Sequence, residues 1–239
     1  MKLSIIIPCY NEEKNIPLIF ERLQGCIQDK NNIEVVLVNN GSTDNTKEVL
    51  ENILQVNNNT NFVVCDVPVN QGYGYGIMQG LNQATGDILS WTHADMQTDP
   101  QDVITAFNKF YTDGYIDNFI VKGKRKNRRL IEAFFTFGMQ IIAFLYLKKY
   151  MDDINAQPKI FSRAFFESYL KNKAPNDFSL DLFLLYTALN NSYSIKTIPV
   201  FFNKRIHGEA KGGGSFKTRI KLIKRTFAYI KELSKSLHN

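Results

Sequence analysis

The sequence contains few of the residues that build disulfide-framed or zinc-centred folds. Its 239 residues include only three cysteines, three histidines and one tryptophan. Cys9, Cys26 and Cys65 lack the close spacing of a zinc site and lie in apolar or helical surroundings. We therefore expect free, buried thiols in a reducing compartment. The cysteine pattern argues against both a disulfide-rich secreted domain and a structural zinc module.

The sequence also lacks a long uninterrupted hydrophobic run. The apolar stretch at 4–8 is followed at once by polar residues, so we expect no signal peptide. The longest apolar stretch, 130–147, is interrupted by Glu132, Thr136 and Gln140 and is bounded by basic pairs. It is borderline for a transmembrane span and better suited to a helix in the membrane interface or against a partner.

Charge of one sign is concentrated late in the chain. The net charge is +6, and in 216–235 the only acidic residue is Glu232 among many lysines and arginines. Such a basic segment indicates an anionic partner, such as lipid head groups or a phosphorylated substrate. The basic residues lack interleaved aromatics and any recognition motif, so nucleic acid is not expected. With 44% hydrophobic residues, the chain can bury a sizeable core.

Strand and helix patterns alternate through the first ninety residues. Such units with short links predict an α/β fold with a mostly parallel, Rossmann-like sheet and right-handed crossovers. Ligands of such sheets bind beyond the carboxyl ends of the strands. Polar clusters follow three of the strands, at 9–13, 39–44 and 93–97. The expected strands are 3–7, 34–38, 61–66 and 87–91, and the expected helices are 15–28, 46–54 and 75–84.

The pattern changes after Pro100. We expect one catalytic domain at 1–215, with a ligand-binding half at 1–110 and a second half at 111–215, followed by a basic C-terminal helix within 216–239. Pro199 indicates that the strand containing it lies at a sheet edge. The expected elements are helix 101–111, strand 119–122, a basic loop 123–129, an aromatic-rich helix 130–150, an extended stretch 154–161, helix 181–189, strand 193–202, a glycine-rich loop 211–215 and helix 216–237.

The segment after the fourth expected strand carries His93, Asp95 and Gln97. If it is extended, the spacing of two places all three side chains on one face. An imidazole, a carboxylate and an amide oxygen could together hold one divalent cation beside a phosphate-bearing ligand. An exposed polar strand end remains the alternative for this triplet alone.

Four motifs in one order resemble those of family 2 glycosyltransferases. They are the opening Ser-Ile-Ile-Ile-Pro-Cys-Tyr-Asn-Glu-Glu at 4–13, Val-Asn-Asn-Gly-Ser-Thr-Asp-Asn-Thr at 38–46, Asn-Gln-Gly-Tyr-Gly-Tyr-Gly at 70–76 with Ala-Thr-Gly-Asp at 84–87, and His-Ala-Asp-Met-Gln at 93–97. The last is similar to the Asp-Ala-Asp-Leu-Gln of the dolichyl- and polyprenyl-phosphate sugar transferases, the dolichol-phosphate mannosyltransferase-like subgroup. The resemblance implies a glycosyltransferase A-type fold.

The resemblance also implies a donor site in the first half of the chain. It places Pro8, Tyr10 and Glu12 around the nucleotide, where Tyr10 offers a stacking face and Glu12 can accept hydrogen bonds from ribose hydroxyls. Asn40 stands where the family has an aspartate that contacts the base, so the pairing would be altered. Gly76 belongs to the segment that lets a helix approach the sugar-nucleotide. A surface turn with charge at a helix N-terminus is the alternative for Tyr10 and Glu12.

For the cation, the resemblance implies Mg²⁺ or Mn²⁺ held by Asp95 and bridged to the donor diphosphate, with Gln97 as a further ligand. Asp95 would thereby act in catalysis, because the cation neutralises the departing nucleoside diphosphate. His93 departs from the family's aspartate. Three interpretations remain open: the cation is held through Asp95 despite the change, the preference shifts toward Mn²⁺, or the site is weakened.

Fewer residues of the sequence indicate how the acceptor is bound. An anionic phosphate acceptor needs cations and no base, whereas a hydroxyl acceptor needs a general base. The resemblance places Lys159 at a phosphate-facing position, and Asp181 is the candidate base or, alternatively, a helix N-terminal charge. Arg205 and Lys211 resemble a loop that closes over the donor diphosphate. A basic cluster from 122 to 129 is either a phosphate site or a solvated loop.

These observations together predict an enzyme: a metal-dependent inverting transferase that moves a hexosyl group from a UDP- or GDP-sugar to a polyprenyl phosphate. We expect it in the cytoplasm, peripherally at the inner face of the cell membrane, with the apolar helix serving membrane contact or a homo-oligomer. Two alternatives remain: transfer to a hydroxyl of a surface polysaccharide or glycolipid, and a nucleotide-sugar-binding protein without turnover.

Overall fold

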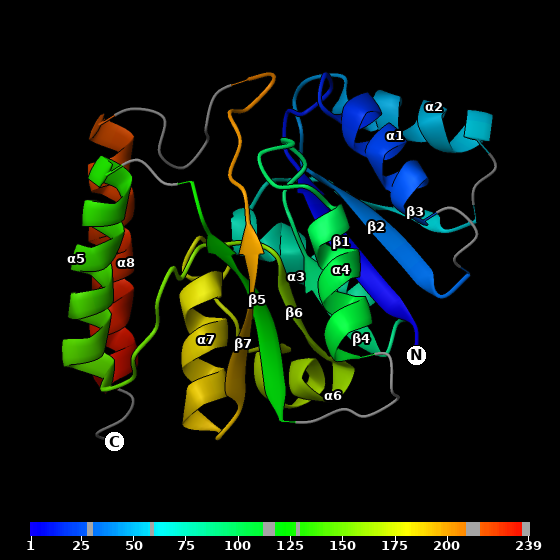
Figure 1. Cartoon of the computed structure of the whole chain (residues 1–239). Coiled ribbons are helices and arrows are strands. Elements are labelled where there is room, and N and C mark those ends of the chain that lie inside the picture. Colours follow the sequence, from blue (N-terminus) through cyan, green and yellow to red (C-terminus); the bar gives the residue numbers. More distant parts are fainter. Residues whose placement is uncertain (28–30, 58–59, 112–117, 128–129, 209–215, 236–239) are drawn as a thin grey trace.

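A seven-stranded mixed sheet organises the chain (Figure 1). The computed structural model describes residues 1–27, 31–57, 60–111, 118–127, 130–208 and 216–235, with the backbone alone at 56–57, 130–136 and 216–219. The strand order is β3-β2-β1-β4-β6-β5-β7. The strands are β1 (Leu3–Cys9), β2 (Ile33–Asn40), β3 (Phe62–Val67), β4 (Ile88–Trp91), β5 (Phe119–Arg125), β6 (Lys159–Ser162) and β7 (Ser194–Val200).

The first four strands form the parallel half of the sheet. β1 pairs in parallel with β2 on one side and with β4 on the other, and β3 pairs in parallel with β2. All eight residues of β2 are buried, which is typical of a parallel strand covered on both faces. The connecting helices are α1 (Ile16–Ile27), α2 (Thr46–Asn57) and α3 (Tyr73–Gln83). The expected strand–helix alternation and mostly parallel sheet are confirmed.

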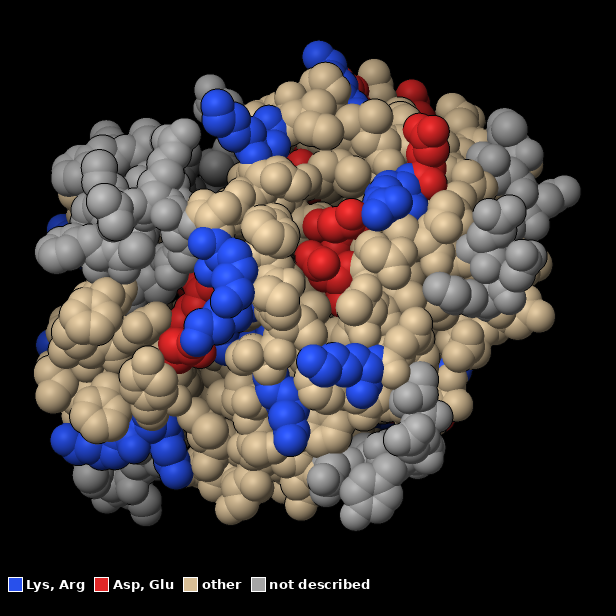
Figure 2. Space-filling view, viewed as in Figure 1, with Lys and Arg blue, Asp and Glu red and all other residues tan. Residues whose placement is uncertain are grey.

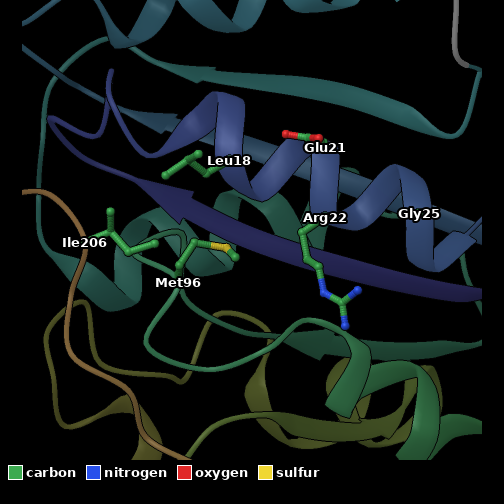
Figure 3. A pocket seen from close by; sticks show the side chains of 6 residues that line it. All are labelled: Leu18, Glu21, Arg22, Gly25, Met96 and Ile206. Atoms are coloured by element: carbon green, nitrogen blue, oxygen red, sulfur yellow. The ribbon is translucent and has the colours of Figure 1, made fainter.

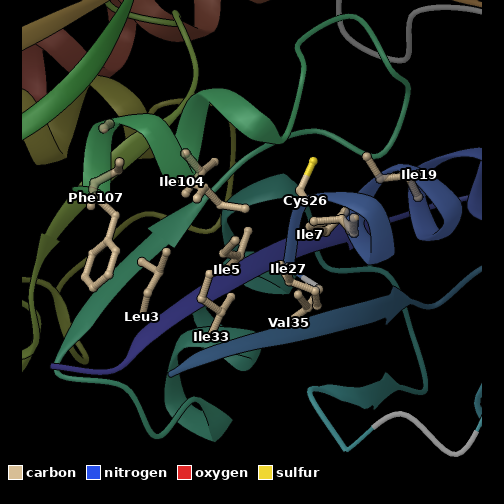
Figure 4. Packing of buried hydrophobic residues seen from close by; sticks show 14 of the residues in the cluster. Leu3, Ile5, Ile7, Ile19, Cys26, Ile27, Ile33, Val35, Ile104 and Phe107 are labelled. Carbon is tan, nitrogen blue, oxygen red and sulfur yellow. The ribbon is translucent and has the colours of Figure 1, made fainter. Parts of the chain in front are cut away.

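Alternating side chains of the strands feed two cores, one on each face of the sheet. On one face, Leu3, Ile5 and Ile7 of β1 pack with Ile19 of α1 and Ile104 of α4 (Gln101–Phe110), as Figure 4 shows. On the other face, residues of β1 and β4 pack against α3 and α7 (Leu180–Asn190). The period of two in a strand thus divides one run of apolar residues between two layers of helices.

The second half of the sheet departs from the parallel pattern. β6 runs antiparallel to both β4 and β5, while β5 and β7 pair in parallel. β7 lies at the sheet edge, as its proline predicted. One expectation was wrong in extent: β5 continues to Arg125, into the expected basic loop. The end of the expected extended stretch at 154–161 belongs to β6, which ends at Ser162. The sequence reading also missed the short helical turns α6 (Arg163–Phe165) and η1 (Phe166–Leu170).

Two long helices stand side by side away from the sheet and run in the same direction (Figure 1). They are α5 (Leu130–Leu147) and α8 (Phe216–Lys235). Ala143 and Leu147 of α5 and Ile230 of α8 are buried between these helices and the body. Within the part of the chain described here, no helix has the length and apolar character needed to cross a membrane.

Candidate active site at the carboxyl edge of the sheet

The ends of β1, β2 and β4 meet at one edge of the sheet. In the β1–β2 register Pro8 lies opposite Val38 and Cys9 opposite Asn39, while Ile6 of β1 lies opposite Trp91 of β4. The polar segments that follow these strands therefore leave the sheet on the same side. This edge carries most of the residues that the sequence singled out.

Arg205 joins the two acidic residues of this edge. Its guanidinium lies 2.6 Å from Oδ2 of Asp95 and 3.1 Å from Oε1 of Glu12. Both carboxylates are nearly inaccessible, with 4% of Asp95 and 8% of Glu12 exposed. A buried carboxylate needs a cation or several hydrogen-bond donors near it, and here one arginine serves both. The structure thus brings together three predicted site residues from distant parts of the chain.

The segment 203–208, which we call the Arg205 segment, is fastened on both sides of this ion pair. The backbone N–H of Asn203 donates to the carbonyl of Gln97 at 2.8 Å, and Nε2 of Gln97 donates to the carbonyl of Asn203 at 3.2 Å. Further along, Nδ2 of Asn15 donates to the carbonyl of His207 at 3.2 Å and to Oε2 of Glu12 at 2.5 Å. The Arg205 segment therefore covers the region between Glu12 and Asp95.

The residues after β4 do not continue as a strand. β4 ends at Trp91, and Met96 adopts a left-handed backbone with φ of 58°. The backbone N–H of Gln97 turns back to donate to Oδ1 of Asp95 at 3.1 Å. The expectation of an extended segment with one shared face was wrong, because this local turn breaks the alternation on which it depended. His93 is half-buried, and its ring lies 6.3 Å from that of Tyr73.

This arrangement does not fit a bound cation. Arg205 occupies one oxygen of Asp95 and the Gln97 N–H the other, while the amide nitrogen of Gln97 is bonded to Asn203. Among the described residues, no group of three or more His, Cys, Asp or Glu side chains is placed to hold a metal ion. The assignment of His93, Asp95 and Gln97 as Mg²⁺ or Mn²⁺ ligands stays a prediction, and in this conformation a protein cation stands beside Asp95.

Asn40 and Gly76 meet at the end of β2. Nδ2 of Asn40 donates to the carbonyl of Gly72 at 3.0 Å, whereas its buried Oδ1 has no partner. A Cβ on Gly76 would stand 2.5 Å from Cγ of Asn40, so the absent side chain makes room for the amide. Pro8 lies within β1 and Tyr10 follows that strand, both half-buried. The unpaired amide oxygen can accept one hydrogen bond from a ligand.

Lys159 and Asp181 form a buried ion pair on the other side of β4. Nζ of Lys159 lies 2.7 Å from Oδ1 of Asp181 and donates to the carbonyl of Ala156 at 2.8 Å. Lys159 is 0% and Asp181 3% exposed, and burial lowers the pKa of the lysine. Nε2 of Gln157 donates to the same Asp181 oxygen at 2.9 Å and to the Tyr73 hydroxyl at 3.2 Å. Asp181 is therefore compensated by partners within the protein.

The basic cluster that begins within β5 divides into different environments. Lys122 is 1% exposed and lies 3.3 Å from Oδ1 of Asp152, and burial lowers its pKa to about 8. Arg125 is paired with Asp153, while Lys124 projects to solvent and pairs with Asp152. The cluster is therefore only partly a solvated loop, which was one of the two interpretations of its sequence. Arg128 and Arg129 lie outside the described residues, as does Lys211 of the predicted closing loop.

Charged side chains gather in separate patches on the face seen in Figure 2. Acidic and basic side chains lie next to each other between α1 and α4, in keeping with the ion pair of Arg22 and Asp99 at 2.7 Å. Basic side chains also gather at the lower ends of α5 and α8 (Figure 2).

A shallow hollow lies behind the Asp95 turn, between α1 and the Arg205 segment (Figure 3). Met96 and Ile206 line it on one side and Leu18, Glu21, Arg22 and Gly25 of α1 on the other. Its lining contains none of the side chains predicted to act on the substrate.

Several residues that complete the site escaped the sequence reading. Asn15 bonds Glu12 three positions earlier, a spacing that one helical turn would have suggested. Gln157 and Tyr73 link the Lys159–Asp181 pair toward His93, and Asn203 holds Gln97. No local signal could have indicated these last contacts, because they join segments that are distant in the sequence.

The chain resembles known proteins over most of its length. The model of glycosyl transferase family 2 matches residues 4–170. The chain is 30% identical over 228 residues to the undecaprenyl-phosphate 4-deoxy-4-formamido-L-arabinose transferase of Photorhabdus laumondii, covering 93% of this chain and 65% of that protein. It is 25% identical over 234 residues to a dolichyl-phosphate beta-glucosyltransferase of Trichomonas vaginalis, covering 93% and 72%. The chain spans just under two thirds of the arabinose transferases' length.

Solved structures share the fold at low identity. A mannosyltransferase of Pyrobaculum calidifontis in complex with GDP-Man and Mn²⁺ aligns with a TM-score of 0.69 and 17% identity, covering 100% of this chain and 64% of that one. Glucosyl-3-phosphoglycerate synthase of Mycobacterium tuberculosis, with Mn²⁺, UDP and phosphoglyceric acid, aligns with a TM-score of 0.74 and 17% identity, covering 98% and 78%. These likenesses confirm the glycosyltransferase A-type fold. The family model, which matches residues 4–170, shows that the chain belongs to glycosyl transferase family 2.

Proposed function

We propose that this protein transfers a hexosyl group from a nucleotide-sugar, UDP- or GDP-linked, to a polyprenyl phosphate with inversion at the anomeric carbon, and that turnover requires Mg²⁺ or Mn²⁺. The bond from the sugar C1 to the donor diphosphate breaks, a bond from C1 to an acceptor phosphate oxygen forms, and the nucleoside diphosphate leaves. The observation that carries the proposal is the meeting of Glu12, Asp95 and Arg205 at the carboxyl edge of a family 2 sheet.

The donor nucleotide is assigned to the ends of β1 and β2. Tyr10 offers an aromatic face to the base, and the unpaired Oδ1 of Asn40 can accept a hydrogen bond from a base N–H. Gly76 keeps the start of α3 close to that amide. The diphosphate would then extend toward Asp95, beneath the Arg205 segment. The base would thus donate a hydrogen bond to Oδ1 of Asn40, which has no partner within the protein.

The acceptor is assigned to a phosphate because the candidate base, Asp181, is already paired within the protein. Asp181 receives both Lys159 and Gln157 on one oxygen, so its charge is already compensated. A sugar hydroxyl would need a carboxylate free to take its proton, whereas a phosphate acceptor is already anionic. The names of the curated relatives, which specify undecaprenyl and dolichyl phosphate, support the same acceptor.

Contact with the cytoplasmic face of the membrane is assigned to α5 and α8. Phe137, Ile141, Phe144 and Leu145 of α5 are 60%, 44%, 48% and 56% exposed. Exposed lysines, Lys148 after α5 and Lys231 and Lys235 of α8, accompany the apolar face. Apolar side chains beside basic ones suit the interface of an anionic bilayer, where the lipid acceptor resides.

The proposal is tested by transfer from a panel of labelled UDP- and GDP-sugars to a short-chain polyprenyl phosphate, with Mn²⁺ or Mg²⁺ and with EDTA. We expect glycolipid formation that requires both lipid and cation. Product formed only on saccharide hydroxyls would replace the acceptor. Donor binding without transfer to any acceptor would favour a binding protein over an enzyme.

A further inference from the structure

We infer that three aromatic rings, those of Tyr73, His93 and Phe178, form the wall against which the transferred sugar of the donor packs. We call these rings the aromatic wall. The Tyr73 ring stacks on that of Phe178, with centroids 4.9 Å apart and planes 9° apart, and lies 6.3 Å from the His93 ring. The inference rests on the proposed function, which it deepens by naming the residues that recognise the sugar.

The aromatic wall lies between the two parts of the proposed site. His93 precedes Asp95, beside which the diphosphate is assigned, by two positions. On the other side, Nε2 of Gln157 joins the Tyr73 hydroxyl to Asp181. Burial and then the charges of Asp181 and Asp95 raise the pKa of the Tyr73 hydroxyl, so this ring is near both carboxylates. The sugar, whose C1 passes from a donor oxygen to an acceptor oxygen, must occupy this interval.

The stack within the aromatic wall is fixed by the close approach of two segments. A Cβ on Gly72 would stand 2.2 Å from the carbonyl oxygen of Asn176, and one on Gly74 would stand 2.3 Å from that of Pro175. The backbone N–H of Tyr75 donates to the same Asn176 carbonyl at 3.0 Å. Because only glycine allows this approach, the segment before α7 is held against the start of α3. The two stacked rings are therefore presented in one arrangement.

A sugar ring is the ligand that suits these surroundings. Its C–H groups can pack on flat aromatic faces, and its hydroxyl groups donate and accept hydrogen bonds. Oε1 of Gln157 is buried beside Tyr73, has no partner among the described residues, and can accept from such a hydroxyl. An isoprenoid chain has no hydroxyl group and a diphosphate has no C–H face, so neither would use both features.

The aromatic wall also gives His93 a role that requires no cation. An imidazole ring can pack against the C–H groups of a sugar, whereas the aspartate that the family has at this position would offer a charge and no face. The change to histidine thus adds a third ring beside Tyr73 and Phe178. If this role is correct, position 93 requires a ring and not a metal ligand.

The test compares the binding of a nucleotide-sugar with that of its nucleoside diphosphate, in one Mg²⁺-containing buffer and without acceptor. Titration calorimetry pairs UDP-glucose with UDP and GDP-mannose with GDP. Phe178→Leu and His93→Leu keep an apolar side chain but lose the ring. For both we expect nucleotide-sugar affinity to fall about tenfold and nucleoside diphosphate affinity to stay within about twofold of the wild type. His93→Phe, which restores a ring, should bind both ligands as the wild type does.

Phe110→Leu is the matched control, because it removes a half-buried ring that lies against Phe119, outside the site. It should leave both affinities unchanged, and circular dichroism melting would verify that each variant is folded. Equal losses for both ligands in Phe178→Leu and His93→Leu, or no loss for either, would overturn the inference while leaving the proposed function intact. If the wild type binds neither UDP nor GDP, the proposed donor site and the inference both fail.

Discussion

Single residues at the carboxyl edge matter through their charge and through the room that their side chains take up. Asp95 is compensated by an arginine 110 positions later in the chain, and Asn40 fits only because residue 76 has no side chain. Each of these side chains depends on a contact with a residue that is distant in the sequence. Each can therefore be tested with one substitution and a control taken from the same fold.

For Asp95→Asn we expect transfer activity to fall at least about 100-fold, because the shape is retained while the carboxylate that holds Arg205, and that the proposed cation requires, is lost. The measurement is the initial rate of glycolipid formation at saturating donor. Asp99→Asn, which breaks the exposed pair with Arg22, should retain the wild-type rate within about twofold. A wild-type rate in Asp95→Asn would remove this residue from the catalytic assignment.

For Gly76→Ala we expect nucleotide affinity to fall about tenfold or more, because the new methyl group displaces the Asn40 amide. Titration calorimetry with UDP and GDP measures the loss. Gly25→Ala is the control: in helix α1 a Cβ there meets nothing within 4 Å, so affinity should be unchanged and stability should rise by about 0.5–1 kcal/mol. Unchanged affinity in Gly76→Ala would separate Asn40 from base recognition.

Among the helices, α5 combines burial on one side with exposure of large apolar side chains on the other. Ala143 and Leu147 are buried, whereas Phe144 and Leu145 are about half exposed. An exposed apolar face of this kind indicates an interaction surface, and the neighbouring lysines favour an anionic one. A change confined to the exposed face should leave the fold intact.

We expect the double change Phe144→Ser and Leu145→Ser to reduce binding to vesicles of anionic phospholipid about tenfold or more, because burial of two large side chains in the interface is lost. Vesicle flotation measures it, with zwitterionic vesicles as the comparison. Transfer to a water-soluble short-chain acceptor should persist. If the double variant floats with the vesicles as the wild type does, the exposed face of α5 does not bind the membrane. If the double variant is a monomer in sedimentation where the wild type is a dimer, the face is a protein interface.

At the scale of elements, the regular first half was predictable because each unit is local. Ile33–Asn40 and Tyr73–Gln83 carry their own periodicity, and the structure moves their expected ends by only a few residues. The site was less accessible to prediction. The turn at Met96 depends on a side-chain bond within the loop, and the partner of Asp95 lies on a segment that only the folded sheet brings near. Which residues belong to the edge could be predicted, but not which of them pair.

At the scale of the whole molecule, the fold buries the side chain of Lys122 away from solvent. Burial lowers the pKa of Lys122 to about 8, below its value of 10.5 in an unfolded chain. Between these values the unfolded chain binds more protons than the folded one, so the free energy of unfolding rises with pH in this window. Below about pH 8 the cost of burying the charge is fully present.

For Lys122→Met we therefore expect a flatter pH dependence of the free energy of unfolding between pH 8 and 10, the difference from wild type being on the order of 2–3 kcal/mol. Urea denaturation at several pH values measures it, and Lys124→Met is the control because that side chain is exposed. Equal slopes in wild type and Lys122→Met would show that Lys122 keeps its ordinary pKa.

The position of Arg205 in the chain also orders the events of biosynthesis. A ribosome makes Glu12 and Asp95 long before the arginine, which follows them by 193 and 110 residues. The four parallel strands can associate as soon as residue 91 has emerged, whereas their acidic edge stays without its arginine until β7 has been added. A nascent chain halted before residue 205 would present two uncompensated carboxylates at the end of an otherwise assembled sheet. The acidic edge is therefore completed only after β7 and the segment that follows it have been made.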